Sequence, residues 1–242
     1  MKRRNFLTIA AAGLGAPLTA CKKAPTVSAD GKPIIRIGHF PNITHVQALL
    51  DLLTKHFKAF FDPDVVEAAI WFHDAVYDTH AKDNEFRSAE LARERLLPAV
   101  HGGKLSSRRL YLIGEMIEAT ATHVVPQLEC PEAVADAEKF LDMDLSILGA
   151  SEPEFDRYEA DVRKEYSWAD DGEWRKGRTG ILQSFLRRDV IFHSELFRSL
   201  LEASARENIL RSLQRLRDPP PVRQAGTQVT SPSDKFSPTS ST

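Results

Sequence analysis

Cysteine is scarce in this chain, and no charge of one sign dominates it. The two cysteines among the 242 residues, Cys21 and Cys130, have no neighbour at the spacing of a metal site or a redox motif, so we expect no disulfide. Lysine and arginine number 32 against 34 aspartates and glutamates, which gives a formal net charge of −2. Because this balance offers no global basic surface for a phosphate backbone, nucleic acid is not expected as a specific partner.

Strand patterns are almost absent after residue 44, and apolar residues recur there at helical spacing. One helix follows Thr44, and the sequence Asp62-Pro63-Asp64 is typical of the cap and first turn of a second helix. A third helix is expected over residues 85–97, with a break at 98–103. Further helices are predicted over residues 106–121, 131–148, 152–166, 172–187 and 194–216. The sequence therefore predicts an all-α helical bundle over residues 44–216.

Both ends of the chain lack the pattern of a folded domain. Residues 217–242 are rich in proline, serine and threonine and are predicted to form a disordered tail. Residues 1–21 begin with a positive segment, and an apolar run over 6–20 follows that is too short for a comfortable membrane span. These features are typical of a signal peptide.

The end of that apolar run carries a more specific signal. The sequence LTAC at residues 18–21 resembles a bacterial lipobox, in which the cysteine is lipidated and becomes the first mature residue. The sequence RRNFL at 3–7 also resembles a twin-arginine export signal. We therefore predict a membrane-anchored lipoprotein on the periplasmic side, attached through Cys21. If the signal is not used, the protein is cytoplasmic.

The segment after the signal carries a second resemblance. The sequence KPIIRIGHFPNITHVQAL at residues 32–49 is similar to the first strand and loop of sulfonate-, nitrate- or taurine-type solute-binding proteins of ABC transporters. Residues 22–43 are interpreted as a tether of this origin. The binding-protein fold needs alternating strands and helices through two lobes, and the remaining sequence does not supply them.

Groups with metal-binding chemistry concentrate around one histidine–aspartate pair. His73 and Asp74 are adjacent at the end of an apolar helix, and adjacent side chains can converge on one ion only near a helix end or an irregularity. His45 opens the preceding helix, and Asp144 lies on a later apolar helix. Imidazole and carboxylate ligands together suit a divalent ion such as Mn, Fe, Co, Ni, Zn or Mg.

The order His, His-Asp, Asp on a helical chain resembles the HD superfamily. Three motifs in order, WFHDAVYD at 71–78, DNEFRSA at 83–89 and FLDMDLSILG at 140–149, are similar to the group called predicted metal-dependent HD superfamily phosphohydrolases. The resemblance covers roughly residues 45–210. It implies an HD-domain helical bundle with metal ligands at His45, His73, Asp74 and Asp144, and hydrolysis of a phosphate ester by metal-activated water.

The resemblance also implies a general acid that protonates the leaving oxygen. In related helical phosphohydrolases a histidine four residues before the first ligand can take that role, but here the position is Pro41, which has no proton to give. This departure indicates an impaired activity or another acid. His123 lies where many HD proteins hold a histidine that faces the site or a second metal, although a structural histidine at a helix end is about equally expected. Asp74 and His123 are the candidate catalytic residues.

The leading functional prediction is a metal-dependent phosphohydrolase acting on a small-molecule phosphoester, which could be a nucleotide. Two alternatives remain open: a lipid-anchored solute-binding component of a transporter, and a non-catalytic metal-binding remnant of an HD domain. Asp142, two residues before Asp144, should point to another face of its helix and is assigned to the surface. His193 and the downstream residues Glu202, Arg206 and Asn208 are assigned to structure before catalysis.

Overall fold

A computed structural model describes residues 43–218, and this part of the chain is all-helical, as predicted. It forms eight α-helices and two short 3-10 helices, with no strand among the described residues. In chain order the elements are α2 (Ile43–Lys55), η2 (Phe57–Ala59), α3 (Pro63–Phe72), α4 (Asn84–His101), α5 (Ser107–Ala119), α6 (Pro131–Asp144), η3 (Leu145–Gly149), α7 (Glu152–Glu165), α8 (Asp171–Leu186) and α9 (Glu195–Arg217).

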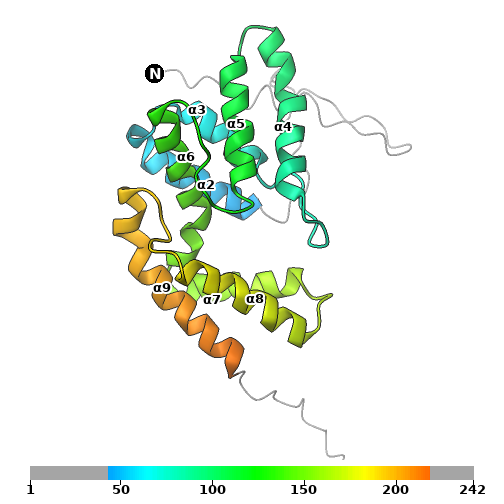
Figure 1. Ribbon diagram of the computed structural model, residues 1–242, viewed down its shortest axis with the longest axis vertical. Coiled ribbons are helices and arrows are strands. Elements are labelled where there is room, and N and C mark those ends of the chain that lie inside the picture. The colour runs from blue at the N-terminus through cyan, green and yellow to red at the C-terminus, as the bar shows by residue number, and fades with distance from the viewer. Residues whose placement is uncertain (1–42, 219–242) are drawn as a thin grey trace, which may run out of the picture.

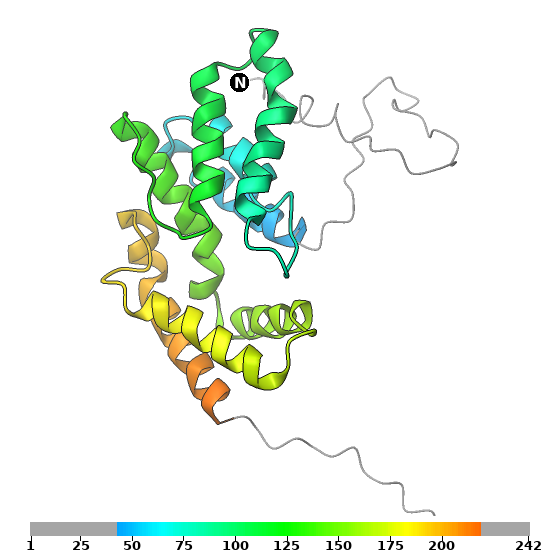
Figure 2. The same cartoon turned by 45° about the vertical axis from the view of Figure 1, so that its right-hand side comes forward.

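The helices lie in two groups that α6 connects (Figure 1). Helices α2 to α5 make one group, in which α4 and α5 run side by side, and α7 to α9 make the other (Figures 1 and 2). A single apolar core extends through both groups, from Leu49 in α2 to Ile209 in α9. The end of α6 and the following η3 lie where the groups meet, so side chains there can face elements from both.

Polar side chains cap several helices close to the predicted starts. The Ser106 hydroxyl, the Asp170 carboxylate and the Ser194 hydroxyl each accept the backbone N–H three residues ahead. Ser151 and Glu154 form a reciprocal capping box at the start of α7. Since the first N–H groups of a helix have no intrahelical partner, these caps fix where the helices begin.

Two details of the predicted helices are wrong. Asp62 is the N-cap residue of α3 and Pro63 opens the helix, as predicted, but the Asp62 side chain makes no cap hydrogen bond and instead accepts two bonds from Arg109, at 2.7 and 2.8 Å. Pro98 lies inside α4, which continues to His101 and ends at Gly102 and Gly103. Pro98 has no N–H to donate to the Glu94 carbonyl, and the helix ends one turn later, where Gly103 adopts the left-handed conformation (φ 67°) that reverses the chain.

Helix α9 holds η3 in place against the core. A Cβ on Gly149 would lie 2.7 Å from the Leu201 Cβ, so only glycine permits this close approach. The buried Asn208 donates from Nδ2 to the carbonyl oxygens of Leu148 and Ala150, at 2.9 Å each. These contacts confirm a structural role for Asn208, and they fix the chain that follows Asp144.

No helix within residues 43–218 is long and apolar enough to cross a membrane. The predicted signal at 1–21, Pro41 and the tether up to residue 42 lie outside the described residues, as does the predicted tail from residue 219 onward.

Candidate metal centre

The structure brings together all five residues that the sequence singles out for chemistry, which we call the His/Asp cluster: His45, His73, Asp74, His123 and Asp144. They come from four separate places in the chain. His45 lies in the first turn of α2, His73 and Asp74 follow the end of α3, and His123 follows α5. Asp144 is the last residue of α6.

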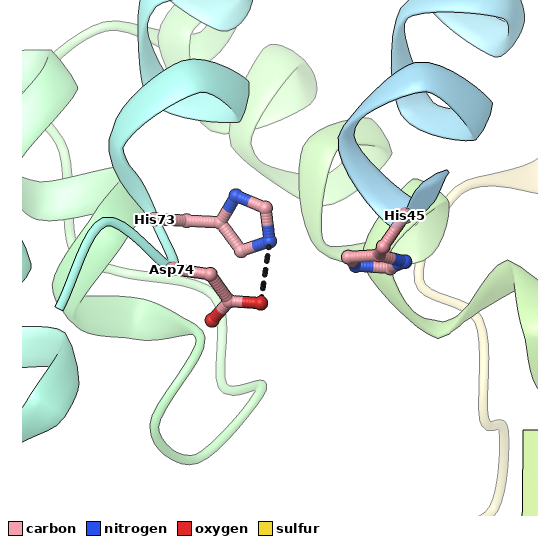
Figure 3. Close-up of side chains that lie close together, drawn as sticks. All are labelled: His45, His73 and Asp74. Carbon is pink, nitrogen blue, oxygen red and sulfur yellow. Dashed lines mark ion pairs between the residues drawn. The ribbon is translucent and has the colours of Figure 1, made fainter. Parts of the chain in front are cut away.

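The end of α3 allows adjacent residues to face the same point, as predicted. The His73 N–H still bonds the Ala69 carbonyl at 2.9 Å, but the helix ends there and the chain turns. Figure 3 shows the His73 ring and the Asp74 carboxylate side by side, with the His45 ring across from them. Ligand atoms of these three residues all lie within 4.8 Å of one another.

His73 is almost fully buried, with 2% of its surface exposed. Its Nδ1–H donates to the Ile70 carbonyl oxygen at 2.9 Å, which fixes the ring and directs Nε2 into the cluster. Nε2 lies 3.4 Å from Asp74 Oδ2 and 3.5 Å from Asp144 Oδ1, and it has no hydrogen-bond partner within the described structure. A buried nitrogen aimed at two carboxylates without a hydrogen bond is suited to a cation.

The charges around His73 favour its protonated form when no metal is bound. Burial lowers the pKa of the imidazole, but the neighbouring Asp74 and Asp144 carboxylates outweigh burial and raise the pKa to about 9. A metal ion that takes the Nε2 position must therefore displace a proton.

Asp144 is the centre of the cluster. Its Oδ1 accepts from His45 Nε2 at 2.8 Å, and its Oδ2 accepts from His123 Nε2 at 2.8 Å. Burial alone would raise the pKa of this carboxyl, but the bonds from His123 and His45 and the nearby His73 hold it well below its usual range. Asp144 thus stays ionised and can share its negative charge with a cation.

The DNEFRSA motif fixes the chain that follows Asp74. Asn84, the first residue of α4, accepts the Asp78 N–H at 3.1 Å and donates to the Asp78 carbonyl at 2.9 Å. The fully buried Ser88 accepts the Val76 N–H at 3.0 Å through its hydroxyl oxygen. Two side chains of the motif therefore hold the turn after the His-Asp pair. The sequence linked these residues to the site only by resemblance, and in the structure they have a structural role.

The prediction that Asp142 lies on the surface is wrong. Asp142 is fully buried and accepts three hydrogen bonds, from the backbone N–H of His193 at 2.7 Å, that of Ser194 at 2.8 Å and the Ser194 hydroxyl at 2.6 Å. Asp142 does point away from the Asp144 side of α6, but that face is covered by the start of α9. Burial raises the pKa of its carboxyl.

Sequence reasoning missed a second polar network near Asp144. Arg178 of α8 is largely buried, pairs with Glu159 of α7, and lies over the Tyr158 ring at 5.5 Å from its centroid. The Ser212 hydroxyl donates to Glu159 at 2.7 Å. Burial, together with the charges of Glu159 and Asp144, raises the pKa of Tyr158 and keeps its hydroxyl neutral. No spacing in the sequence indicates these contacts, because they join three helices.

The donor set of the His/Asp cluster fits a divalent ion. Imidazole nitrogens and a carboxylate oxygen of His45, His73 and Asp74 lie within 4.8 Å of one another, and Asp144 Oδ1 lies 3.5 Å from His73 Nε2. The buried His73 Nε2 has no hydrogen-bond partner among the described residues. Comparisons of the chain with protein-family models, with curated proteins and with solved structures found no match.

Proposed function

We propose that this chain is a metal-dependent phosphohydrolase of the HD type, with His45, His73, Asp74 and Asp144 holding a divalent cation. The observation that carries the proposal is the buried His73 Nε2, which faces two carboxylates and has no hydrogen bond to any part of residues 43–218. A divalent ion at such a site lowers the pKa of a water molecule and polarises a phosphoryl oxygen. The identity of the ion stays open among Mn, Fe, Co, Ni, Zn and Mg.

The protein's own contribution is to fix the ligands before any substrate arrives. The Ile70 carbonyl sets the His73 tautomer, so that Nε2 and not Nδ1 faces the cation. Asp144 holds the imidazoles of His45 and His123 in place through hydrogen bonds. A small phosphoester would add its anionic oxygens to this site, whereas a polyanionic nucleic acid finds no global basic surface on a chain of net charge −2.

His123 is the residue we propose as the proton donor to the leaving oxygen. It lies beside Asp144, and its imidazole can donate a proton. Pro41, at the position where related enzymes can hold the general acid, has no proton to donate. Asp74 is proposed as a ligand that also orients the attacking water. Without a general acid a reaction of this kind slows by about 10²–10⁴-fold, so His123→Gln should produce that loss while the metal stays bound.

The alternatives separate in the same experiment. The full-length protein is reconstituted with Mn²⁺, and its metal content and its turnover of bis(p-nitrophenyl) phosphate are measured. Bound metal with turnover supports the enzyme, and bound metal without turnover of this or other phosphoesters supports the non-catalytic remnant. We do not propose a transporter component, because residues 43–218 contain no strand with which to build the alternating fold of a solute-binding protein.

The place of action is proposed from the first 21 residues. A lipidated Cys21 would hold the protein to a membrane on the periplasmic side, since export machinery reads the signal itself. Fractionation of cells expressing the intact chain beside a Cys21→Ala variant tests this. Membrane recovery that depends on Cys21 supports the anchor, and equal cytosolic recovery of both forms means that the signal is not used.

A further inference from the structure

The backbone of His123 is unusual within the described chain. His123 has a φ of 52° and is the one non-glycine residue in 43–218 with a positive φ. Side chains with a Cβ rarely adopt this left-handed region, and such residues collect at functional sites where neighbouring groups hold them. Its N–H still bonds the Ala119 carbonyl at 2.8 Å, so the strained turn directly follows α5.

Two side chains from a distant connection meet at the carbonyl oxygen of this residue. His193 Nε2–H donates to the His123 oxygen at 3.0 Å, and Arg188 donates to it from Nη1 at 3.3 Å. The other terminal nitrogen of Arg188, Nη2, donates to the Thr122 oxygen at 2.8 Å. Both residues lie between α8 and α9, some 65 to 70 positions along the chain.

The connection that carries these donors is itself held firmly. Glu202 accepts the backbone N–H groups of Ile191 and Phe192, at 3.0 and 3.1 Å. Arg206, which pairs with Glu202, donates to the carbonyl oxygens of Arg188 and Asp189. Asp142 accepts the His193 N–H. Helix α6, which carries Asp144, therefore also fixes the segment that holds His123. Because His123 bonds to Asp144, these contacts form a closed ring.

Arg188 differs from other partly buried arginines in its partners. Arg178, Arg206 and Arg211 each pair with a carboxylate. Within residues 43–218 no carboxylate pairs with Arg188, whose hydrogen bonds go to the carbonyl oxygens of Thr122 and His123. Its guanidinium lies 4.8 Å from the centroid of the Phe185 ring, which in turn lies edge-on to the His123 ring at 6.2 Å. Arginine presents several donors in a rigid fork, which suits it to hold two successive carbonyls.

We propose that Arg188 and His193 are positioning residues for His123: together they hold its left-handed backbone and thereby keep its imidazole against Asp144. The role in turnover rests on the proposed phosphohydrolase function, whereas the positioning itself does not. Removing a residue that holds a site residue in place, without itself touching the metal, typically reduces activity roughly 10- to 100-fold. The effect should therefore appear in turnover without loss of the metal, since neither residue is among the proposed ligands.

The first test reads the position of His123 without any activity. The full-length, metal-free protein is labelled with ¹⁵N-histidine, and the His123 imidazole signals are assigned by their loss in His123→Gln. Arg188→Gln and His193→Phe should each shift these signals, and the double variant should shift them further. Arg187→Gln, which changes an exposed neighbour of the same type, should leave them in place. Unshifted signals in the folded double variant overturn the proposal.

The second test uses a double-mutant cycle on turnover of bis(p-nitrophenyl) phosphate with Mn²⁺. Arg188→Gln should reduce kcat roughly 10- to 100-fold, with unchanged metal stoichiometry, and should have no further effect in a His123→Gln background. An equal loss in both backgrounds overturns positioning through His123. If Arg188→Gln does not fold, Arg188→Lys replaces it in both tests. If no variant and no native protein turns over a phosphoester, the proposed function fails, and the imidazole signals still decide the positioning.

Discussion

Two aspartates at the end of α6 show how differently the fold uses the same side chain. Asp144 accepts from the imidazoles of His45 and His123 and faces that of His73, and its pKa is held well below the usual range. Asp142 is fully buried, its partners are backbone N–H groups and a hydroxyl, and burial raises its pKa. The partners of Asp144 are imidazoles, whose ring nitrogens can bind metal ions, whereas backbone N–H groups cannot bind one. Asp144 therefore belongs to the proposed metal site, whereas Asp142 has a structural role, because it holds the start of α9.

Removing a carboxylate from the cluster should produce the largest functional effect. We expect Asp74→Ala and Asp144→Asn each to abolish metal retention and turnover while leaving most of the helix content, because a lost ligand spoils the site and not the core. Metal stoichiometry after gel filtration, with circular dichroism on the same sample, measures both. Asp161→Ala removes an exposed carboxylate as a matched control. Unchanged stoichiometry in Asp74→Ala would contradict the ligand assignment.

Removing Asp142 should have the opposite result: the protein should lose stability but keep its metal. Asp142→Ala leaves two backbone N–H groups and the Ser194 hydroxyl buried without their acceptor, which should lower the free energy of unfolding by roughly 3–5 kcal/mol. The surviving folded protein should still retain metal. Urea unfolding of the metal-free protein gives the stability, and metal analysis at low temperature gives the retention. A variant that keeps full stability but loses its metal would mean that the two aspartates have been assigned the wrong roles.

The pH dependence of stability should report the protonation of His73, whose ring faces Asp144 and Asp74. His73 has a folded pKa of about 9, above the value of about 6.5 in the unfolded chain, so its contribution is fully present below pH 6.5 and is lost as pH rises through 9. The metal-free protein should therefore lose roughly 3 kcal/mol over this window. Urea unfolding with a chelator at several pH values measures it.

Two comparisons check the origin of that pH dependence. His73→Gln should flatten the curve, since glutamine does not titrate. Metal-loaded protein should not lose stability over the same range, because the ion competes with a proton for His73 Nε2 and gains affinity as pH rises. An unchanged slope in His73→Gln would assign the titration to another group.

The smallest effect on stability is expected at Ser194, which contacts Asp142 and the first turn of α9. Its hydroxyl donates to Asp142 and also accepts the Phe197 N–H at the start of α9. Ser194→Ala should reduce stability by about 1–2 kcal/mol through loss of the cap and of one bond to Asp142. Metal content should not change. A threonine hydroxyl can make both of these bonds, so Ser194→Thr serves as the matched control in the same urea titration.

The sequence by itself determined the helical class, the approximate helix bounds and a set of residues that meet in space. These features are local, or they follow from a motif: apolar spacing, the helix start at Asp62-Pro63-Asp64, and a His-Asp pair at a helix end. The sequence also placed Asp142 on a different face from Asp144. It could not tell whether that face was exposed, because the answer depends on the start of α9, about fifty residues later.

Only the tertiary structure decided how His123 is held. Its left-handed backbone and the donors Arg188 and His193 come together because the connection between α8 and α9 lies beside the turn that follows α5, and no spacing in the sequence encodes this contact. The bond from His73 Nδ1 to the Ile70 carbonyl is local, but Nε2 reaches Asp144 only because α3 packs against α6. Residue types and periodicity fix which groups are available, whereas burial and hydrogen-bond geometry fix which of them face one another.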